Sequence, residues 1–278
     1  MSTALAAPAT SRPTNEVTFG RVVRAEWIKF RSVRSTFWTL PITAGVMVGL
    51  AVLQAWGTTA LETTSEVETQ AATIVTGGWF LAQAVVSVLA VLMITGEYSA
   101  GMIRSTFAAV PRRLPALWAK ALVLAVAVAL VSAVAVGLSW LASLPFLGQL
   151  DLGIDLGTAD DLRLLVGTPL YLATIALLAL AVGALIRHSA GAIALMLGML
   201  LVVEGVLSAL PFRVFEVISP FLPSTAGARL VVDTPTLEWM NAASTGPQLT
   251  PWQGYAVLLG WVVVLSVAAA ALMRRRDA

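Results

Sequence analysis

Six long stretches of this sequence are apolar and almost free of ionised residues. Each contains 20 to 24 residues, and about 20 residues of α-helix are enough to cross the hydrocarbon core of a bilayer, which is about 30 Å thick. Only helices satisfy the backbone hydrogen bonds of such continuous apolar stretches in lipid, because a membrane barrel strand would be shorter and would alternate. The expected spans are residues 37–56, 73–95, 121–144, 167–186, 189–210 and 252–273.

Composition supports an all-α integral membrane protein and excludes several other classes. Of the 278 residues, 58% are hydrophobic and 12% are charged, and a water-soluble domain usually carries about twice that charged fraction. The chain has no cysteine, so it has no disulfide framework, thiolate nucleophile or thiolate metal site. Its single histidine, His188, argues against a histidine-ligated zinc centre. The net charge of +2 is too small to indicate nucleic-acid binding.

The basic residues gather on one side of the predicted membrane. Six crossings place both termini on the same side, and the segments on that side hold 14 of the 17 Lys and Arg residues. The positive-inside rule assigns such segments to the cytoplasm, so both termini are predicted to be cytoplasmic. The segments in question are residues 1–36, 96–120, 187–188 and 274–278.

The segment before the first span divides into a tail and a helix. Residues 1–18 are small and polar and lack the apolar core of a signal peptide, so we predict a disordered cytoplasmic tail before one six-span domain at residues 19–278. Residues 19–37 place apolar side chains on one side of a helix, which predicts an amphipathic helix along the inner leaflet. Glu26 interrupts that apolar side. It either pairs with a nearby Arg or Lys, or docks on a partner chain or on the loop at residues 96–120.

The loop at residues 96–120 is predicted to contain a short helix. Residues 99–109 are long enough for three helical turns, and Pro111 and Pro115 would end or redirect the helix before the third span. A helix held on a cytoplasmic loop is a surface that another protein can push. An ordinary basic loop that only sets the topology is the alternative interpretation.

A few polar residues lie inside the predicted spans. Glu204 is the one ionisable residue among them, and a carboxylate in this position should face protein or water because of its cost in lipid. It either lines a substrate path or makes a hydrogen bond between helices. Gln54 and Gln83 leave the same two interpretations open, with ordinary interhelical bonding favoured.

Catalytic motifs are absent from the sequence. The only lysines are Lys29 and Lys120, and neither belongs to a G-x-x-x-x-G-K-[ST] phosphate-binding loop. The chain also lacks H-E-x-x-H and G-x-S-x-G. Asp160 and Asp161 are adjacent carboxylates, but neighbouring positions on a helix do not face one site, so we predict a solvated surface role. We therefore expect no enzyme activity, cofactor or metal in this chain.

Four segments in order resemble the permease subunits of type-two ABC transporters, especially actinobacterial ones. The resemblance covers essentially the whole chain from about Val22 to Met273. The segments are RAEWIKFRSVRSTFWTL before the first span, GEYSAGMIRSTFAAVPRR after the second, LIRHSAGAIALMLGMLLV between the fourth and fifth, and ISPFLPSTAGARL before the last.

The resemblance implies which surfaces meet a separate ATPase. In such permeases the amphipathic helix and a coupling helix after the second span receive the ATP-binding subunit, here Arg24–Arg34 and Glu97–Arg113. The segment Phe215–Asn241 would form short helices near the outer surface. The implied coupling residues are Glu26, Glu97, Tyr98, Gly101, Arg104, Arg112 and Arg113.

The resemblance also implies an assembly of two permeases and two ATPases, with ATP and magnesium on the ATPases. Permeases of this family meet through their first and fifth spans, so Gly45 and Gly49, four residues apart in the first span, are candidate subunit contacts. Packing inside one bundle is the equal alternative.

The function implied is export of a hydrophobic or amphiphilic substrate across the bacterial plasma membrane by alternating access. A non-transporting scaffold or sensor subunit and a stand-alone ion-coupled transporter are the alternatives. A lone ion-coupled transporter would be expected to carry more intramembrane charge than Glu204.

Overall fold

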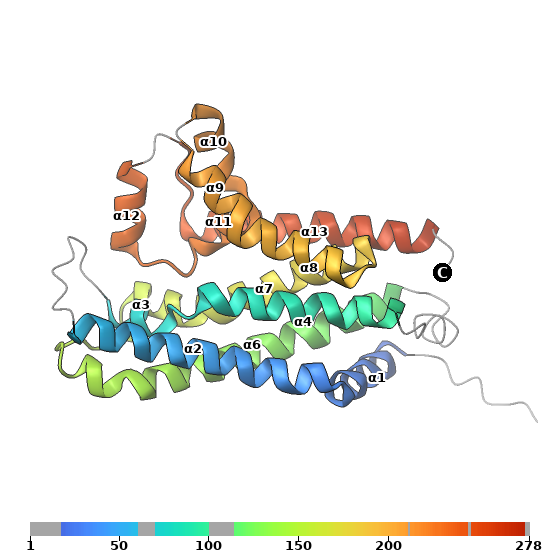
Figure 1. Ribbon diagram of the computed structural model, residues 1–278, viewed down its shortest axis with the longest axis horizontal. Coiled ribbons are helices and arrows are strands. Elements are labelled where there is room, and N and C mark those ends of the chain that lie inside the picture. Colours follow the sequence, from blue (N-terminus) through green and yellow to red (C-terminus); the bar gives the residue numbers. More distant parts are fainter. Residues whose placement is uncertain (1–17, 61–69, 100–113, 211, 244–245, 276–278) are drawn as a thin grey trace, which may run out of the picture.

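The computed structural model describes residues 18–60, 70–99, 114–210, 212–243 and 246–275. The described residues are mostly helical, and none of them lies in a strand (Figure 1). Six helical segments are long and apolar enough to cross a membrane, which confirms the predicted all-helical, six-span fold. These are Thr36–Ala60, Ala71–Ser99, Leu114–Leu147, Ala159–Ile186, Ser189–Ala209 and Pro251–Arg274.

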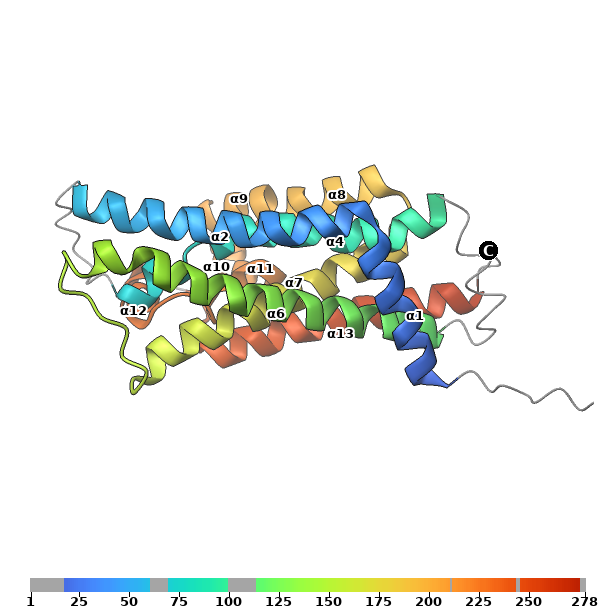
Figure 2. The ribbon, with the colours of Figure 1, turned by 90° about the horizontal axis from the view of Figure 1, so that it is seen from below.

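The chain begins with the predicted amphipathic helix and turns sharply into the first span. Helix α1 (Phe19–Ser32) ends at Val33, which has extended backbone, and α2 (Arg34–Ala60) follows. Helix α1 crosses the end of the bundle at a steep angle to α2 (Figure 2). It buries Val22, Glu26 and Phe30, which are spaced four residues apart and so share one face. The polar tail predicted at residues 1–18 lies almost wholly outside the described residues.

The second span is interrupted, although the sequence predicts one continuous helix. Helix α3 (Ala71–Thr76) and helix α4 (Trp79–Ser99) are separated by Gly77 and Gly78. A Cβ atom added at Gly78 would lie 2.5 Å from the Cα of Met47 in α2. Glycine is therefore required here because the two backbones approach closely.

The third and fourth spans form the centre of the bundle. Helix α6 (Leu114–Leu147) has 34 residues, or about 51 Å of helix, so it extends beyond the hydrocarbon core. Helix α7 (Ala159–Ile186) is the most buried span and packs against α4, α6 and the last helix. A Cβ at Gly183 of α7 would lie 2.7 Å from Cγ2 of Ile94, so α4 and α7 pack through a small residue.

The fifth span changes its helical form in the middle. Helix α8 (Ser189–Leu197) is followed by the π-helical segment η1 (Gly198–Val203) and by α9 (Glu204–Ala209). The Nδ1 atom of His188 accepts a hydrogen bond from the backbone N–H of Gly191 at 3.1 Å, so this histidine caps α8. Helix α9 and the segment after it rise away from α2, α4 and α6 (Figure 1).

Short helices connect the fifth span to the last. They are α10 (Arg213–Ile218), the 3-10 turn η2 (Ser219–Phe221), α11 (Pro223–Ala228) and α12 (Thr234–Ala243). The longest has 10 residues, which is about half of what a crossing needs. The predicted non-crossing helices are therefore present. Helix α13 (Pro251–Arg275) completes the bundle and packs against α7 and α11.

The bundle has two ends with different elements. One end, here called the α1 end, carries α1, the last turn of α4, the start of α6, the α7–α8 turn and the end of α13 (Figures 1 and 2). The other end, the α12 end, carries α3, α10 and α12.

Charged side chains organise the α12 end, and the prediction of a solvated surface role is wrong for Asp161, which is buried, whereas Asp160 is partly exposed. Asp160 accepts hydrogen bonds from the N–H and hydroxyl of Thr234 at 3.0 and 2.7 Å and pairs with Arg163. Asp161 is buried and accepts from the N–H of Asp155 at 2.8 Å. Arg163 donates to three backbone carbonyls between residues 229 and 232. These side chains fix loops because they satisfy backbone groups that the helices leave without partners.

Candidate functional site

Four charged residues meet inside the bundle at the α1 end. They are Glu26 and Lys29 of α1, Glu97 of α4 and Lys120 of α6, and we call them the charge cluster. The Nζ atom of Lys120 lies 2.7 Å from Oε2 of Glu26 and 2.9 Å from Oε1 of Glu97. The Nζ atom of Lys29 lies 2.9 Å from Oε1 of Glu26 and 3.3 Å from Oε1 of Glu97. Each lysine therefore bridges the same two carboxylates.

The charge cluster is removed from solvent. Glu26 is 2% exposed, Lys120 3% and Glu97 6%, whereas the side chain of Lys29 is 37% exposed. Two positive and two negative charges balance, which is a requirement for burial because each uncompensated buried ion costs several kcal/mol. The cluster is an internal network of ion pairs, and the described residues contain no group of His, Asp and Glu that could hold a metal.

Electrostatics keep the α1 members of the cluster charged. Burial raises the pKa of Glu26, but the attraction of Lys120 and Lys29 is stronger, so the pKa of this carboxyl lies below its ordinary value. Burial lowers the pKa of Lys29, and the two carboxylates reverse this effect, so the pKa of Lys29 lies above its ordinary value. Both groups are therefore ionised at neutral pH.

The four residues of the charge cluster connect three helices, α1, α4 and α6. Glu97 is in the last turn of α4, and Lys120 is in the second turn of α6. The two helices that residues 100–113 connect in the sequence, α4 and α6, therefore both contact α1 through the charge cluster. A cavity of about 180 Å³ adjoins the cluster between α1, α2 and α4.

The end of α4 contacts a fourth region of the bundle. The hydroxyl of Ser189, at the start of α8, donates to the hydroxyl of Thr95 at 2.8 Å. The guanidinium of Arg187, in the α7–α8 turn, lies over the ring of Tyr98 at 5.1 Å from its centre. A displacement of the end of α4 would therefore act on α1, α6 and the α7–α8 turn together.

Comparison with known protein families decides the identity of this bundle. Residues 22–208 match the family described as ABC-2 family transporter protein, and the match includes the whole charge cluster and runs from α1 into α9. The chain belongs to this family. A comparison with curated proteins gives no match. The chain is thus an ABC-2 permease with six apolar membrane-spanning helices, and permeases of this family are membrane subunits that generally work with an ATPase subunit.

The structure of the permease brings together two of the residues predicted for ATPase coupling. Glu26 and Glu97 both belong to the charge cluster, and Tyr98 lies beside it under Arg187. Glu26 pairs with a lysine one turn away, as one interpretation expected, and also with Lys120 at the end of the 96–120 loop, as the other expected. The remaining predicted residues, and the coupling helix itself, lie outside the described residues: Gly101, Arg104, Arg112 and Arg113.

Sequence reasoning missed the two lysines of the permease as members of this site. It left open which nearby Arg or Lys pairs with Glu26, and it considered Lys120 only as a residue that fails to form a phosphate-binding loop. A usable signal was present, because Glu97 ends the second span and Lys120 begins the third at the same side of the membrane. An acid and a base at matched depth on consecutive helices are expected to pair.

Glu204 of the permease lies at the start of α9, directly after the π-helical segment. It is 2% exposed. Its carboxylate accepts hydrogen bonds from the N–H of Ser224 at 3.0 Å and from the N–H and hydroxyl of Thr225 at 2.6 and 2.9 Å. It therefore caps the start of α11. These contacts join two helices, as one interpretation expected, and a role in the substrate path remains a prediction.

The two glutamines differ in their surroundings. Gln83 is fully buried, and its Oε1 accepts from the hydroxyl of Tyr171 at 2.6 Å. Its Nε2 has no hydrogen-bond partner among the described residues. Gln54 is exposed and covers Gly77, at the break in the second span. The contact of Gln83 is an interhelical bond, and a lining role for either residue remains a prediction.

Gly45 and Gly49 lie on the exposed face of α2. A Cβ added at either position would meet no described atom within 4 Å. Close packing at these glycines inside the bundle is therefore not observed for the described part of the chain. A subunit contact at this face remains a prediction.

Proposed function

We propose that this permease is the membrane subunit of an ATP-driven exporter in the bacterial plasma membrane. The α1 end and both termini face the cytoplasm, where two copies of a separate ATPase bind. A second copy of the chain, or a close relative, completes the membrane part. The substrate is hydrophobic or amphiphilic, and it moves outward by alternating access.

The charge cluster is the observation that carries this proposal. An ATPase that contacts residues 100–113 would act on the segment that connects α4, which carries Glu97, to α6, which carries Lys120. Lys120 binds Glu26 and Glu97 binds Lys29, so the movement would reach α1, α4 and α6 at once. Buried ion pairs have strict geometry, because breaking one leaves an uncompensated charge. The cluster therefore favours movement of α1, α4 and α6 as one rigid body, rather than local bending of a single helix.

The distribution of basic residues supports the orientation. Arg21, Arg24 and Arg31 on α1 and Arg274 on α13 lie at the α1 end. Basic residues near the ends of spans favour the cytoplasmic side. ATP is a cytoplasmic fuel, so the same side must carry the surface that receives the ATPase.

Alternating access requires two arrangements of the helices with different affinity for the ATP-loaded partner. In this scheme the outer gate lies near Glu204. It links the fifth span to α11 at a π-helical segment, and such segments occur frequently at functional sites. Closure of the outer end would then depend on the contact between α9 and α11.

Reconstitution of the permease with its ATPase in lipid vesicles tests the proposal. The double variant Glu97→Gln/Lys120→Gln removes one charge of each sign, so the cluster stays neutral and Glu26 keeps its pair with Lys29. We expect the complex to assemble with a reduced stimulation of ATP hydrolysis by substrate. Glu238→Gln, an exposed change on α12, is the control and should behave like the parent.

Two results would overturn the proposal. Transport by the purified chain without any ATPase would exclude a subunit that depends on a partner. A membrane-impermeant reagent that labels a cysteine at position 274 from outside intact cells would reverse the orientation. Assembly with an ATPase but no movement of any candidate cargo would favour the scaffold or sensor function.

A further inference from the structure

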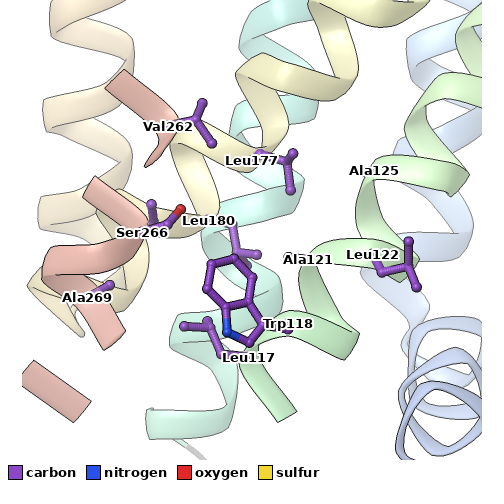
Figure 3. A pocket seen from close by; sticks show the side chains of 11 residues that line it. Leu117, Trp118, Ala121, Leu122, Ala125, Leu177, Leu180, Val262, Ser266 and Ala269 are labelled. Carbon is purple, nitrogen blue, oxygen red and sulfur yellow. The ribbon is translucent and has the colours of Figure 1, made fainter. Parts of the chain in front are cut away.

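An apolar groove lies between α6, α7 and α13. It has a volume of about 280 Å³, and its lining is apolar except for one hydroxyl, that of Ser266. Figure 3 shows the indole of Trp118 extending from α6 across the groove toward Ser266 and Ala269 of α13. The other lining residues are Leu117, Ala121, Leu122, Ala125, Leu177, Leu180, Ala181 and Val262.

The groove belongs to one leaflet. Its α6 residues run from Leu117 to Ala125 and its α13 residues from Val262 to Ala269, which is about 10 to 12 Å along a helix. One leaflet contributes about 15 Å of the hydrocarbon core. The groove begins in the first turns of α6 and therefore lies in the half of the bundle nearest the α1 end.

Polar and basic groups lie at the end of the groove that reaches the membrane surface. Trp118 is 45% exposed, and tryptophan at this depth typically places its N–H among lipid headgroups. Arg274 is exposed and follows Ala269 by five residues, or about 7.5 Å along α13. Positive charge at this level complements a phosphate group.

We propose that the groove binds an anionic phospholipid of the leaflet at the α1 end. One acyl chain lies against α6, α7 and α13, and the phosphate lies beside Arg274 and the indole N–H of Trp118. The apolar lining and the restriction to one leaflet match an acyl chain, and the positive charge of Arg274 matches an anionic headgroup rather than a zwitterionic one. The long side chain of Arg274 can reach the headgroup level from the helix end.

The position of the groove favours a lipid over a second copy of the chain. The exposed glycines Gly45 and Gly49 are on α2, and Figure 2 shows α2 and α13 at opposite sides of the bundle. The groove is thus away from the face with a candidate subunit contact. The lipid site does not depend on the proposed function, because binding requires neither ATP nor an ATPase.

Photo-crosslinking tests the lipid site in the full chain. The permease is purified in detergent with phosphatidylglycerol that carries a photoreactive group on one acyl chain, and crosslinked peptides are mapped by mass spectrometry. We expect products at residues 117–125 and 262–269. Ala125→Phe and Ala121→Phe fill the groove from two adjacent turns and should lower this crosslinking about tenfold, because each displaced methylene weakens binding several-fold.

Matched variants separate the groove from the rest of the lipid-facing surface. Val126→Phe adds the same ring at the neighbouring exposed position outside the groove and should leave crosslinking unchanged. In the parent, unlabelled phosphatidylglycerol should compete with the photoreactive lipid better than unlabelled phosphatidylcholine does. In Arg274→Gln the two unlabelled lipids should compete equally, whereas Arg31→Gln, an exposed change on α1, should keep the preference for phosphatidylglycerol. Equal crosslinking in the groove-filling variants and Val126→Phe would overturn the proposal. So would a preserved preference for the anionic lipid in Arg274→Gln.

Discussion

Lys120 is buried between two carboxylates at the α1 end of the bundle. It binds Glu26 at 2.7 Å and Glu97 at 2.9 Å. A cationic group at the start of an apolar span is costly unless it is paired, and here the pairing also selects which helices can lie next to α6. The charge cluster therefore determines how α1 and α4 pack at this end.

Removal of Lys120 alone is expected to destabilise the permease strongly. Lys120→Met leaves two buried carboxylates with Lys29 as the remaining cation of the cluster, and breaking a buried pair in this way costs about 3 to 5 kcal/mol. Thermal unfolding in detergent should show a much lower midpoint for this variant. The double variant Lys120→Met/Glu97→Gln removes one charge of each sign and should recover most of the loss. Equal midpoints for the two variants would contradict the role given to the ion pairs.

The cluster also predicts how stability depends on pH. The pKa of Glu26 lies below its ordinary value of 4.5 in the folded chain. Its carboxylate therefore stabilises the fold above that ordinary value, and the contribution is lost as the pH falls through the lower folded pKa. The difference in unfolding midpoint between the parent and Glu26→Gln should shrink as the pH falls below 4.5 and through the lower folded pKa. A difference that stays constant over this range would be inconsistent with the pairing of Glu26 with Lys120 and Lys29.

Helix α11 depends on a carboxylate from another element. Its six residues are too few for a stable helix on their own. Glu204 satisfies the N–H groups of Ser224 and Thr225, which have no partner within the helix. The carboxylate also lies at the positive end of the short helix dipole. The start of α11 is therefore fixed to the fifth span.

Loss of this cap should loosen α11. Glu204→Ala leaves two buried N–H groups without an acceptor, at a cost of about 1 to 3 kcal/mol for each unsatisfied group. Hydrogen exchange followed by mass spectrometry should show faster exchange in peptides that cover residues 223–230. Glu238→Gln on α12 should not change the exchange of these peptides. Unchanged exchange in Glu204→Ala would show that α11 is held in place by its other contacts.

The break between α3 and α4 predicts a strong difference between two glycines. Gly78→Ala would place a methyl group 2.5 Å from the Cα of Met47, and such overpacking costs about 1 to 3 kcal/mol. Gly45→Ala meets open space in the same bundle and should not lower the stability of the isolated chain. The unfolding midpoints of the two variants check this expectation. Similar midpoints would mean that α2 can shift to accept the added methyl group.

The six spans could be predicted from the sequence because their apolar length alone separates them from loops. The breaks inside them could not. Gly77 and Gly78 lie in an apolar stretch whose composition suits a continuous helix, and only the backbone of Met47 shows why glycine is needed. The π-helical turn before Glu204 is likewise a result of packing. Spans that are apolar on all sides carry little information about which face contacts which neighbour.

Part of the candidate site could be predicted from the sequence, and the rest depends on tertiary packing. Glu26 stood out because an acid interrupted an apolar face, and the family resemblance indicated Glu97. Lys120 gave a weaker signal, since a lysine near the end of a span commonly extends to the membrane surface. Its burial depends on α1 folding back over α6, which is a tertiary contact between residues 94 positions apart. Such a contact has no local pattern in the sequence.

At the scale of the whole molecule, the exposed face of α2 is expected to meet a second subunit. Gly45 and Gly49 lie on this face, and small residues four apart let two membrane helices approach closely. The chain has no cysteine, so a single introduced thiol reports one position. Gly45→Cys should give a disulfide-linked dimer on mild oxidation in native membranes.

The matched control for this dimer is on the opposite side of the bundle. Val264 of α13 is 61% exposed, and α13 is far from α2 in Figure 2, so Val264→Cys should remain monomeric under the same oxidation. If both variants crosslink equally, the contact is collisional. If neither does, α2 faces lipid, and the second permease must pack against another side of the bundle. In that case the two glycines would let α2 pass close to other helices in a different state of the transport cycle.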